Sequence, residues 1–164
     1  MSFDSQLINQ YHQIFHELLA KKIMVTCAES CTGGLLGSLF TEIDGSSKVF
    51  ERGFITYSNL SKIEMLGVDE NLIKKFGAVS EQVALAMAKG AIQNSKAQLA
   101  IAITGIAGPS GGTIDKQVGT VFIALVSDDY QIVKKFIFTS KNRQNNRESS
   151  VRESLLLIKN YLNL

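Results

Sequence analysis

A short segment between residues 26 and 34 gathers many of the chain's reactive side chains. Its sequence, Thr-Cys-Ala-Glu-Ser-Cys-Thr-Gly-Gly, combines a carboxylate, two thiols, hydroxyl groups and two adjacent glycines. An apolar run at 23–25 precedes it, as expected of a buried strand, and apolar residues recur at helical spacing after it. A strand that turns directly into a helix presents unbonded backbone N–H groups at the positive end of the helix dipole. The segment therefore predicts either a capped turn or a site for an anion or a reacting group.

Ser30 is the candidate nucleophile of this segment. A serine hydroxyl is a weak nucleophile that needs a neighbouring base, and both histidines of the chain lie far away on a predicted N-terminal helix. A lysine can act as the base when burial lowers its pKa. Lys62 follows the next predicted strand, near Tyr57, whose phenol could relay or orient the proton. These residues predict acyl transfer, with N–H groups of the 30–34 turn as the oxyanion hole. The alternative is a surface lysine beside a core tyrosine.

Residues 104–118 form the most irregular stretch of the chain. It opens with Thr-Gly-Ile-Ala-Gly-Pro-Ser-Gly-Gly-Thr, in which half of the residues are glycine or proline. Long loops inside a compact domain are usually functional or disordered. Backbone N–H groups in such a glycine-rich loop are suited to binding a phosphate.

Helical and strand patterns alternate along the chain. Helices are predicted over residues 3–20, 33–43, 58–66, 69–76, 80–94 and 144–162, and strands over 22–27, 49–57, 98–103, 119–126 and 131–138. Strands separated by helices favour a parallel sheet, and the hairpin made by the last two strands adds an antiparallel part. We therefore expect a single α/β domain over residues 1–164. Its architecture should be a three-layer α/β/α sandwich with a mostly parallel, mixed sheet.

Three polar segments, at 28–34, 57–62 and 104–113, each follow a predicted strand. In an open α/β sheet, ligands bind outside the carboxyl ends of the strands. If these three strands are neighbours, the three segments converge on one cleft.

Composition narrows the class of protein further. The chain of 164 residues has a formal charge of +2, which is too small to indicate binding to nucleic acid or to an anionic membrane surface. No apolar run approaches the roughly 20 residues of a membrane-spanning helix, and the N-terminus does not resemble a signal peptide, so we expect a cytoplasmic protein. Cys27 and Cys31 lack the further ligands of a zinc site. We expect them to be packing residues, with a thiol switch as the alternative.

Four motifs resemble the CinA C-terminal domain family, the PncC-type nicotinamide-nucleotide amidohydrolases. They are Ala-Glu-Ser-Cys-Thr-Gly-Gly at 28–34, Ile-Thr-Tyr-Ser-Asn at 55–59, Gly-Ala-Val-Ser-Glu at 77–81, and Thr-Gly-Ile-Ala-Gly-Pro at 104–109 followed by Val-Gly-Thr-Val at 118–121. The resemblance implies hydrolysis of nicotinamide mononucleotide to nicotinate mononucleotide and ammonia, without a metal or cofactor. It also implies a Ser30 nucleophile with Lys62 as base and Tyr57 as partner, and a homo-oligomer. Ser110 and Gln117 depart from the family pattern, outside these catalytic positions.

The substrate implied by the resemblance carries a cationic ring, a carboxamide and a phosphate. The candidate substrate-binding residues are Glu29, Cys31, Thr32, Gly33, Gly34, Thr104, Gly105, Ala107, Gly108, Arg143 and Arg147. The phosphate is assigned to the 104–113 loop, with the two arginines as second candidates. Glu29 could face the pyridinium ring or brace Lys62. Two other hypotheses stay open: a non-catalytic module that binds a nucleotide or phosphate, and regulation through the two thiols.

Overall fold

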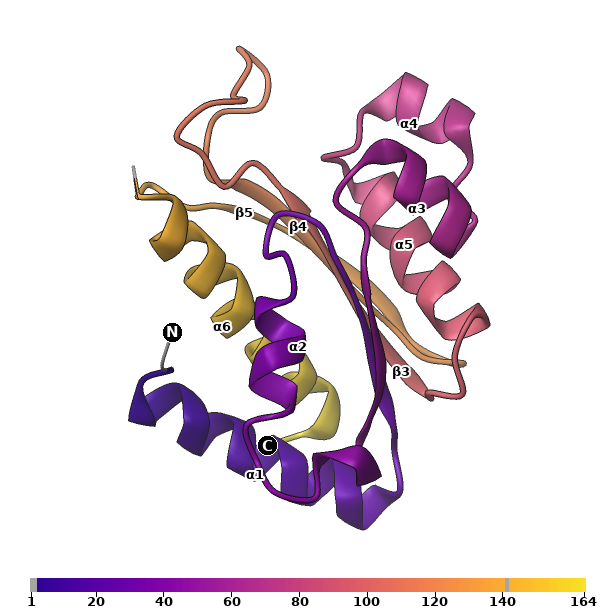
Figure 1. The fold of residues 1–164 in the computed structure, drawn as a ribbon, viewed down its shortest axis with the longest axis vertical. Helices are drawn as coiled ribbons and strands as arrows, with labels where there is room; N and C mark the ends of the chain where they lie inside the picture. The colour runs from indigo at the N-terminus through magenta and orange to yellow at the C-terminus, as the bar shows by residue number, and fades with distance from the viewer. Residues whose placement is uncertain (1–2, 141) are drawn as a thin grey trace.

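A five-stranded sheet runs through the middle of the computed structural model, which describes residues 3–140 and 142–164 (Figure 1). Helices cover both faces of this sheet. In chain order the elements are α1 (Ser5–Lys21), β1 (Val25–Glu29), α2 (Leu35–Phe40), the 3-10 helix η1 (Ser46–Lys48), β2 (Phe50–Ile55), α3 (Asn59–Leu66), α4 (Glu70–Phe76), α5 (Glu81–Gln93), β3 (Leu99–Gly105), β4 (Thr120–Val126), β5 (Gln131–Ile137) and α6 (Arg143–Leu162).

The sheet has the strand order β2-β1-β3-β4-β5. β1 pairs in parallel with β2 and with β3, whereas β4 is antiparallel to both of its neighbours. Four strands therefore run in one direction and β4 runs against them. The predicted α/β class, with a mixed, mostly parallel sheet between two helical layers, is confirmed.

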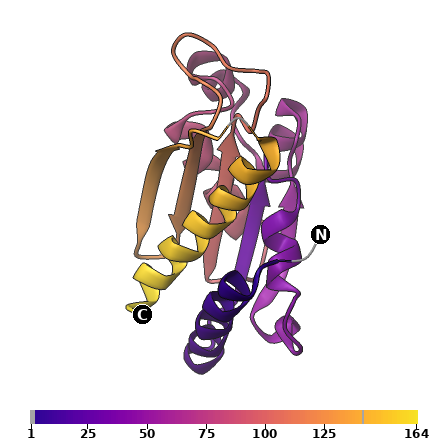
Figure 2. The same ribbon diagram turned by 90° about the vertical axis from the view of Figure 1, so that its left-hand side faces the viewer.

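Alternating side chains of the central strand β3 form the two halves of the core. Leu99, Ile101 and Ile103 pack with α1, α2 and α6, while Ala100 and Ala102 face α5 on the other side. Figure 2 shows α6 lying across the first of these faces. Because an alanine side chain is small, α5 can approach the sheet closely on the second face.

The turn between β1 and α2 differs from the prediction. The strand expected at 22–27 lies at Val25–Glu29, and the helix expected at 33–43 shortens to Leu35–Phe40. Gly33 and Gly34 have φ angles of 58° and 92°, so they form a left-handed turn instead of the first helical turn. As a result, Glu29 ends the strand and Ser30 is the first residue after it.

The connections that leave β1 and β2 diverge at the carboxyl edge of the sheet. The chain passes from β1 to α2 in one helical layer and from β2 to α3 in the other. Neighbouring strands whose connections diverge in this way open a crevice between them, which is where ligands bind in such sheets. β3 and β5 end at the same edge. The fold thus brings Ser30, the start of α3, the loop after β3 and the start of α6 to one end of the molecule.

Gly90 on α5 allows the close approach of α3, the helix that carries Lys62. A Cβ atom at this position would lie 2.0 Å from the Leu66 carbonyl oxygen. We expect Gly90→Ala to lower the free energy of unfolding by about 2 kcal/mol, because the two backbones must move apart. Urea unfolding followed by circular dichroism measures this loss. The exposed neighbour Lys89→Ala is the control and should change stability by less than about 0.5 kcal/mol. Equal unfolding midpoints for the two variants would contradict the packing described here.

Candidate active site

Ser30 and Lys62 meet at the crevice between β1 and β2. The Lys62 Nζ atom lies 3.0 Å from Ser30 Oγ, within hydrogen-bond distance. The Ser30 N–H donates to the carbonyl of Ile103, which continues the ladder between β1 and β3 and fixes the serine backbone. Lys62 is held by α3, whose N-terminus is closed by a capping box between Ser58 and Ser61. The structure therefore brings the predicted nucleophile and base into direct contact.

Lys62 is buried among neutral groups. Its side chain is fully enclosed, with a residue exposure of 1%, and Nζ also donates to the Thr56 carbonyl at 2.8 Å. The carbonyls of Tyr57 and Ser58 lie farther away, at 3.5 and 3.4 Å. Burial lowers the pKa of Lys62 from 10.5 to about 8. A substantial share of neutral amine is therefore present near neutral pH, and a neutral amine can accept the proton of Ser30.

Tyr57 lies on the rim of the site. Its side chain is 61% exposed, and its hydroxyl accepts a hydrogen bond of 2.8 Å from Arg143 Nη2. Within residues 3–140 and 142–164 the phenol makes no hydrogen bond to Ser30 or Lys62. Tyr57, the third predicted catalytic residue, therefore pairs with Arg143 and not with Ser30 or Lys62.

Glu29 occupies the start of α2. Its buried carboxylate accepts hydrogen bonds from the backbone N–H groups of Gly34, Leu36 and Gly37 at 3.1, 3.1 and 2.8 Å. The Cys27 thiol lies 3.6 Å from the same carboxylate. Neither role considered for Glu29 from the sequence matches this geometry, because it pairs with α2 instead of Lys62 and does not line the cleft. The helix start expected to bind an external anion already holds an internal one.

Two backbone N–H groups of the turn stay available for an oxyanion. Those of Ser30, Gly33 and Gly34 donate to the Ile103 carbonyl, the Ser30 carbonyl and the Glu29 carboxylate respectively. Within the described part of the chain, the N–H groups of Cys31 and Thr32 have no acceptor. The N–H of the residue after a nucleophilic serine is a common oxyanion donor. Of these two residues only Cys31 lines the cleft described below, so its N–H is the candidate oxyanion donor of this turn.

A cleft of about 350 Å³ opens beside the Ser30–Lys62 contact. It is lined by Ser30, Cys31, Tyr57, Asn59, Lys62, Ala78, Val79, Thr104, Gly105, Ile106, Ala107, Gly108, Ser110, Gly111 and Arg143. Its lining thus contains the permanent cation of Arg143, the amine of Lys62 and, among the described residues, no carboxylate. Such a cleft favours a ligand that carries negative charge.

Most of the predicted binding residues lie in this cleft, but some do not. Cys31, Arg143 and the predicted residues of the loop after β3 line it, whereas Thr32, Gly33, Gly34 and Arg147 are not among its lining residues. Sequence reasoning missed Asn59, Ala78 and Val79 as lining residues, although all three belong to motifs at 55–59 and 77–81. The Thr104 hydroxyl donates to the Ala78 carbonyl at 2.8 Å, which ties these two walls together.

The first turns of α6 tie the remaining walls of the cleft to one another. Arg147 donates to the Thr32 carbonyl through Nε and Nη2, at 3.2 and 2.6 Å. Asn146 Nδ2 donates to the Ala107 carbonyl at 3.0 Å, and Arg143 Nη1 donates to the Gly108 carbonyl at 2.9 Å. Asn146 was missed from the sequence, where its one signal is a polar residue on the buried face of an amphipathic helix.

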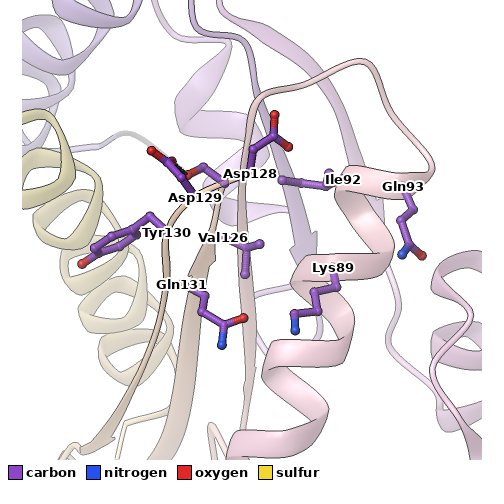
Figure 3. Close-up of a pocket in the computed structure, with 9 residues that line it drawn as sticks. Lys89, Ile92, Gln93, Val126, Asp128, Asp129, Tyr130 and Gln131 are labelled. Atoms are coloured by element: carbon purple, nitrogen blue, oxygen red, sulfur yellow. Dashed lines mark hydrogen bonds between the residues drawn. The ribbon is translucent and has the colours of Figure 1, made fainter.

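A second cavity, of about 450 Å³, lies at the opposite edge of the sheet (Figure 3). Lys89 from α5 and Asp128, Asp129 and Tyr130 from the β4–β5 hairpin contribute to its lining. The Ser127 hydroxyl there donates to the Asp129 carboxylate at 3.0 Å, so it is not paired with a base such as lysine. This cavity therefore lacks the nucleophile–base contact of the first.

The cysteines form no disulfide and are buried in the core. Burial raises the pKa of both thiols, that of Cys31 to about 12, so both are protonated at neutral pH. This agrees with the packing role expected for them. Over residues 3–140 and 142–164, no cluster of three or more His, Cys, Asp or Glu side chains could hold a metal ion. The same residues include no helix with the length and apolar character needed to cross a membrane.

Comparison with known sequences identifies a family for this chain. Residues 8–162 match the family described as CinA C-terminal domain. The protein named nicotinamide-nucleotide amidohydrolase PncC from Escherichia coli strain K12 is 48% identical over 124 residues, which cover 76% of this chain and 75% of that protein. A CinA-like protein from Colwellia psychrerythraea is 54% identical over 116 residues, or 71% of this chain. The chain spans only 27% of that longer relative.

Comparison with solved structures agrees. The crystal structure of the competence/damage inducible protein CihA from Agrobacterium tumefaciens superposes with a TM-score of 0.95 at 40% sequence identity. The match covers 100% of this chain and 99% of that one. Sequence motifs, strand order and overall structure lead to one conclusion: the chain belongs to the CinA C-terminal domain family.

Proposed function

We propose that the protein is an amidohydrolase that converts nicotinamide mononucleotide and water to nicotinate mononucleotide and ammonia. The observation that carries this proposal is the 3.0 Å contact between Ser30 Oγ and the buried Lys62 Nζ at the carboxyl edge of the sheet. The relative named nicotinamide-nucleotide amidohydrolase, at 48% identity, supports the choice of substrate. The chemistry uses side chains and water alone.

Acylation begins with the neutral form of Lys62. Its amine takes the proton of the Ser30 hydroxyl while Oγ forms a bond to the carboxamide carbon of the substrate. The carbonyl π electrons move to oxygen and give a tetrahedral oxyanion. The free N–H group of Cys31 is the candidate donor for this oxygen, because Cys31 directly follows Ser30, lines the cleft and has no acceptor for its N–H in the described chain.

Collapse of the tetrahedral intermediate releases ammonia. The Lys62 ammonium returns its proton to the amide nitrogen, the C–N bond breaks, and an acyl ester remains on Ser30. Water then attacks the ester carbon as Lys62 takes a proton from it. The C–Oγ bond breaks, Oγ recovers its proton from Lys62, and the product leaves as a carboxylate after its acid proton passes to ammonia or water. The serine and the neutral lysine are restored at the end of each cycle.

The charges of the cleft fit both ends of this substrate. Arg143 supplies a permanent positive charge for the phosphate, on the wall formed with Gly108. Lys62 works in its neutral form and therefore does not repel the cationic pyridinium ring. A cationic ring bound beside Lys62 would favour the neutral amine further.

Removing either member of the pair should abolish turnover. We expect Ser30→Ala and Lys62→Met each to lower kcat for ammonia release from nicotinamide mononucleotide by at least about 1,000-fold, because the nucleophile and base act as a unit. A coupled ammonia assay measures this, and Lys89→Met, at the other cavity, is the matched control. Undiminished release by Ser30→Ala would exclude serine as the nucleophile. Thermal stabilisation by the nucleotide without any turnover would instead support a binding module.

The activity should rise with pH through the pKa of Lys62. The base must be neutral, and the neutral fraction grows as pH approaches and passes about 8. We expect kcat/KM to increase about tenfold per pH unit below that value and to level off above it. A rate that does not change between about pH 6 and 9 would contradict lysine as the base.

Protein stability gives a test of the same pKa without substrate. Between about pH 8 and pH 10.5 the unfolded chain holds a proton on Lys62 that the folded protein has lost. The free energy of unfolding of the wild type should therefore rise with pH in this window relative to Lys62→Met. Urea unfolding at a series of pH values measures the difference. Parallel profiles for the two proteins would show that the lysine pKa is not lowered by folding.

A further inference from the structure

Among the residues that the structure describes, Arg143 is the one arginine that lines the cleft, and it has no charged partner there. Arg52 and Arg152 form ion pairs with Glu51 and Asp4. The fork of Arg147 is occupied by the Thr32 carbonyl. Arg143 lines the cleft and, within the described residues, donates only to the neutral oxygens of Tyr57 and Gly108.

The loop beside Arg143 presents further donors to the same space. Gly108, Ser110 and Gly111 line the cleft, and within residues 3–140 and 142–164 their backbone N–H groups have no acceptor. A guanidinium next to several free N–H groups suits an oxyanion with several acceptor oxygens, such as a phosphate.

The partner of Arg143 links this anion site to the reacting end. The Tyr57 side chain reaches the guanidinium with its hydroxyl, while the Tyr57 carbonyl lies 3.5 Å from Lys62 Nζ. One residue thus borders the buried amine through its backbone and the cationic rim through its phenol. Any ligand that takes over the guanidinium also changes what the phenol can bind.

We infer that binding of the substrate phosphate to Arg143 releases the Tyr57 hydroxyl toward the reacting carboxamide. The inference rests on the proposed amidohydrolase function. The bond between Arg143 and Tyr57 is exposed to solvent and joins a charge to a neutral group, so it is easily exchanged. A phosphate accepts a bidentate, charge-assisted pair from the same fork and is the stronger partner.

This coupling makes the phosphate an activator as well as a handle for binding. A ligand shifts a conformational equilibrium only through its different affinity for the two states, and here the phosphate binds the state in which Arg143 has left Tyr57. Nicotinamide riboside carries the same carboxamide without the phosphate and leaves Arg143 with Tyr57. The phosphate should therefore raise kcat in addition to lowering KM.

The experiment compares ammonia release from nicotinamide mononucleotide and nicotinamide riboside in four proteins. They are the wild type, Arg143→Gln, Tyr57→Phe and the control Arg152→Gln, which changes an arginine on the same helix outside the cleft. We expect Arg143→Gln to lower kcat/KM for the nucleotide by on the order of 100-fold. The riboside should keep its kcat/KM or gain activity in this variant, because the guanidinium no longer holds the Tyr57 hydroxyl. Tyr57→Phe should lower kcat for the nucleotide while its KM stays unchanged.

Free phosphite, a small dianion, tests the coupling directly. It should raise kcat/KM for the riboside in the wild type and in Arg152→Gln, but not in Arg143→Gln or Tyr57→Phe. An equal loss of kcat/KM for both substrates in Arg143→Gln would overturn the inference. The loss would then come from the missing hydrogen bond to the Gly108 carbonyl and not from the phosphate. An effect of the phosphate confined to KM would overturn the release of Tyr57.

Failure of the proposed function would look different. In that case the wild type releases no ammonia from either compound. Calorimetric measurement of binding to the same proteins then tests whether Arg143 binds the phosphate. An affinity at least about tenfold higher for the nucleotide than for the riboside, lost in Arg143→Gln, supports it. Equal affinities overturn it. Circular dichroism melting of each variant checks that the fold is intact.

Discussion

The burial of a lysine amine with no carboxylate beside it, among the residues that the structure describes, is the constraint on which the rest of the site depends. Lys62 is enclosed by carbonyl oxygens and the Ser30 hydroxyl, none of which carries a charge. Such a group costs stability in its protonated form, so the surrounding elements must hold it firmly. The capped start of α3, the close approach of α5 at Gly90 and the adjacency of β1 and β2 all serve this purpose. In return, the lowered pKa supplies a base in a chain whose histidines lie elsewhere.

The second buried charge is kept apart from the first. Glu29 directly precedes the candidate nucleophile, yet its carboxylate points to three N–H groups of α2. A carboxylate beside Lys62 would favour the ammonium form and remove the base. The helix start gives Glu29 its own partners and lets the tight turn after Ser30 keep its shape. The two ionisable groups are therefore held separately: Glu29 orders the turn, and Lys62 is the proposed base.

The layout of the site could be predicted from sequence because each polar segment directly follows a strand. Strong apolar periodicity predicted the helices and the hairpin. The rule that ligands bind at strand ends predicted that Ser30 and Lys62 lie close together. The direction of side chains could not be predicted in the same way. The partners of Glu29 depend on the left-handed glycines at 33 and 34, which shortened α2. The bond from Arg143 to Tyr57 spans 86 residues and leaves no local pattern. The roles of Ser30 and Lys62 followed from the chemistry of their side chains and from the family resemblance, and periodicity carried no information about them.

The contacts of α6 have a consequence for the order in which the site is built during translation. Arg147 binds a carbonyl 115 residues earlier, and Asn146 binds one 39 residues earlier. The nucleophile, the base and the glycine-rich loop are all synthesised before either of these side chains. The Ser30–Lys62 contact uses only residues made earlier, whereas these hydrogen bonds around the cleft need a folded α6. The contacts around the cleft are therefore complete only when nearly all of the described chain has folded. Cleavage of the backbone between β5 and α6 would separate Arg147 and Asn146 from the segment that carries Ser30 and Lys62.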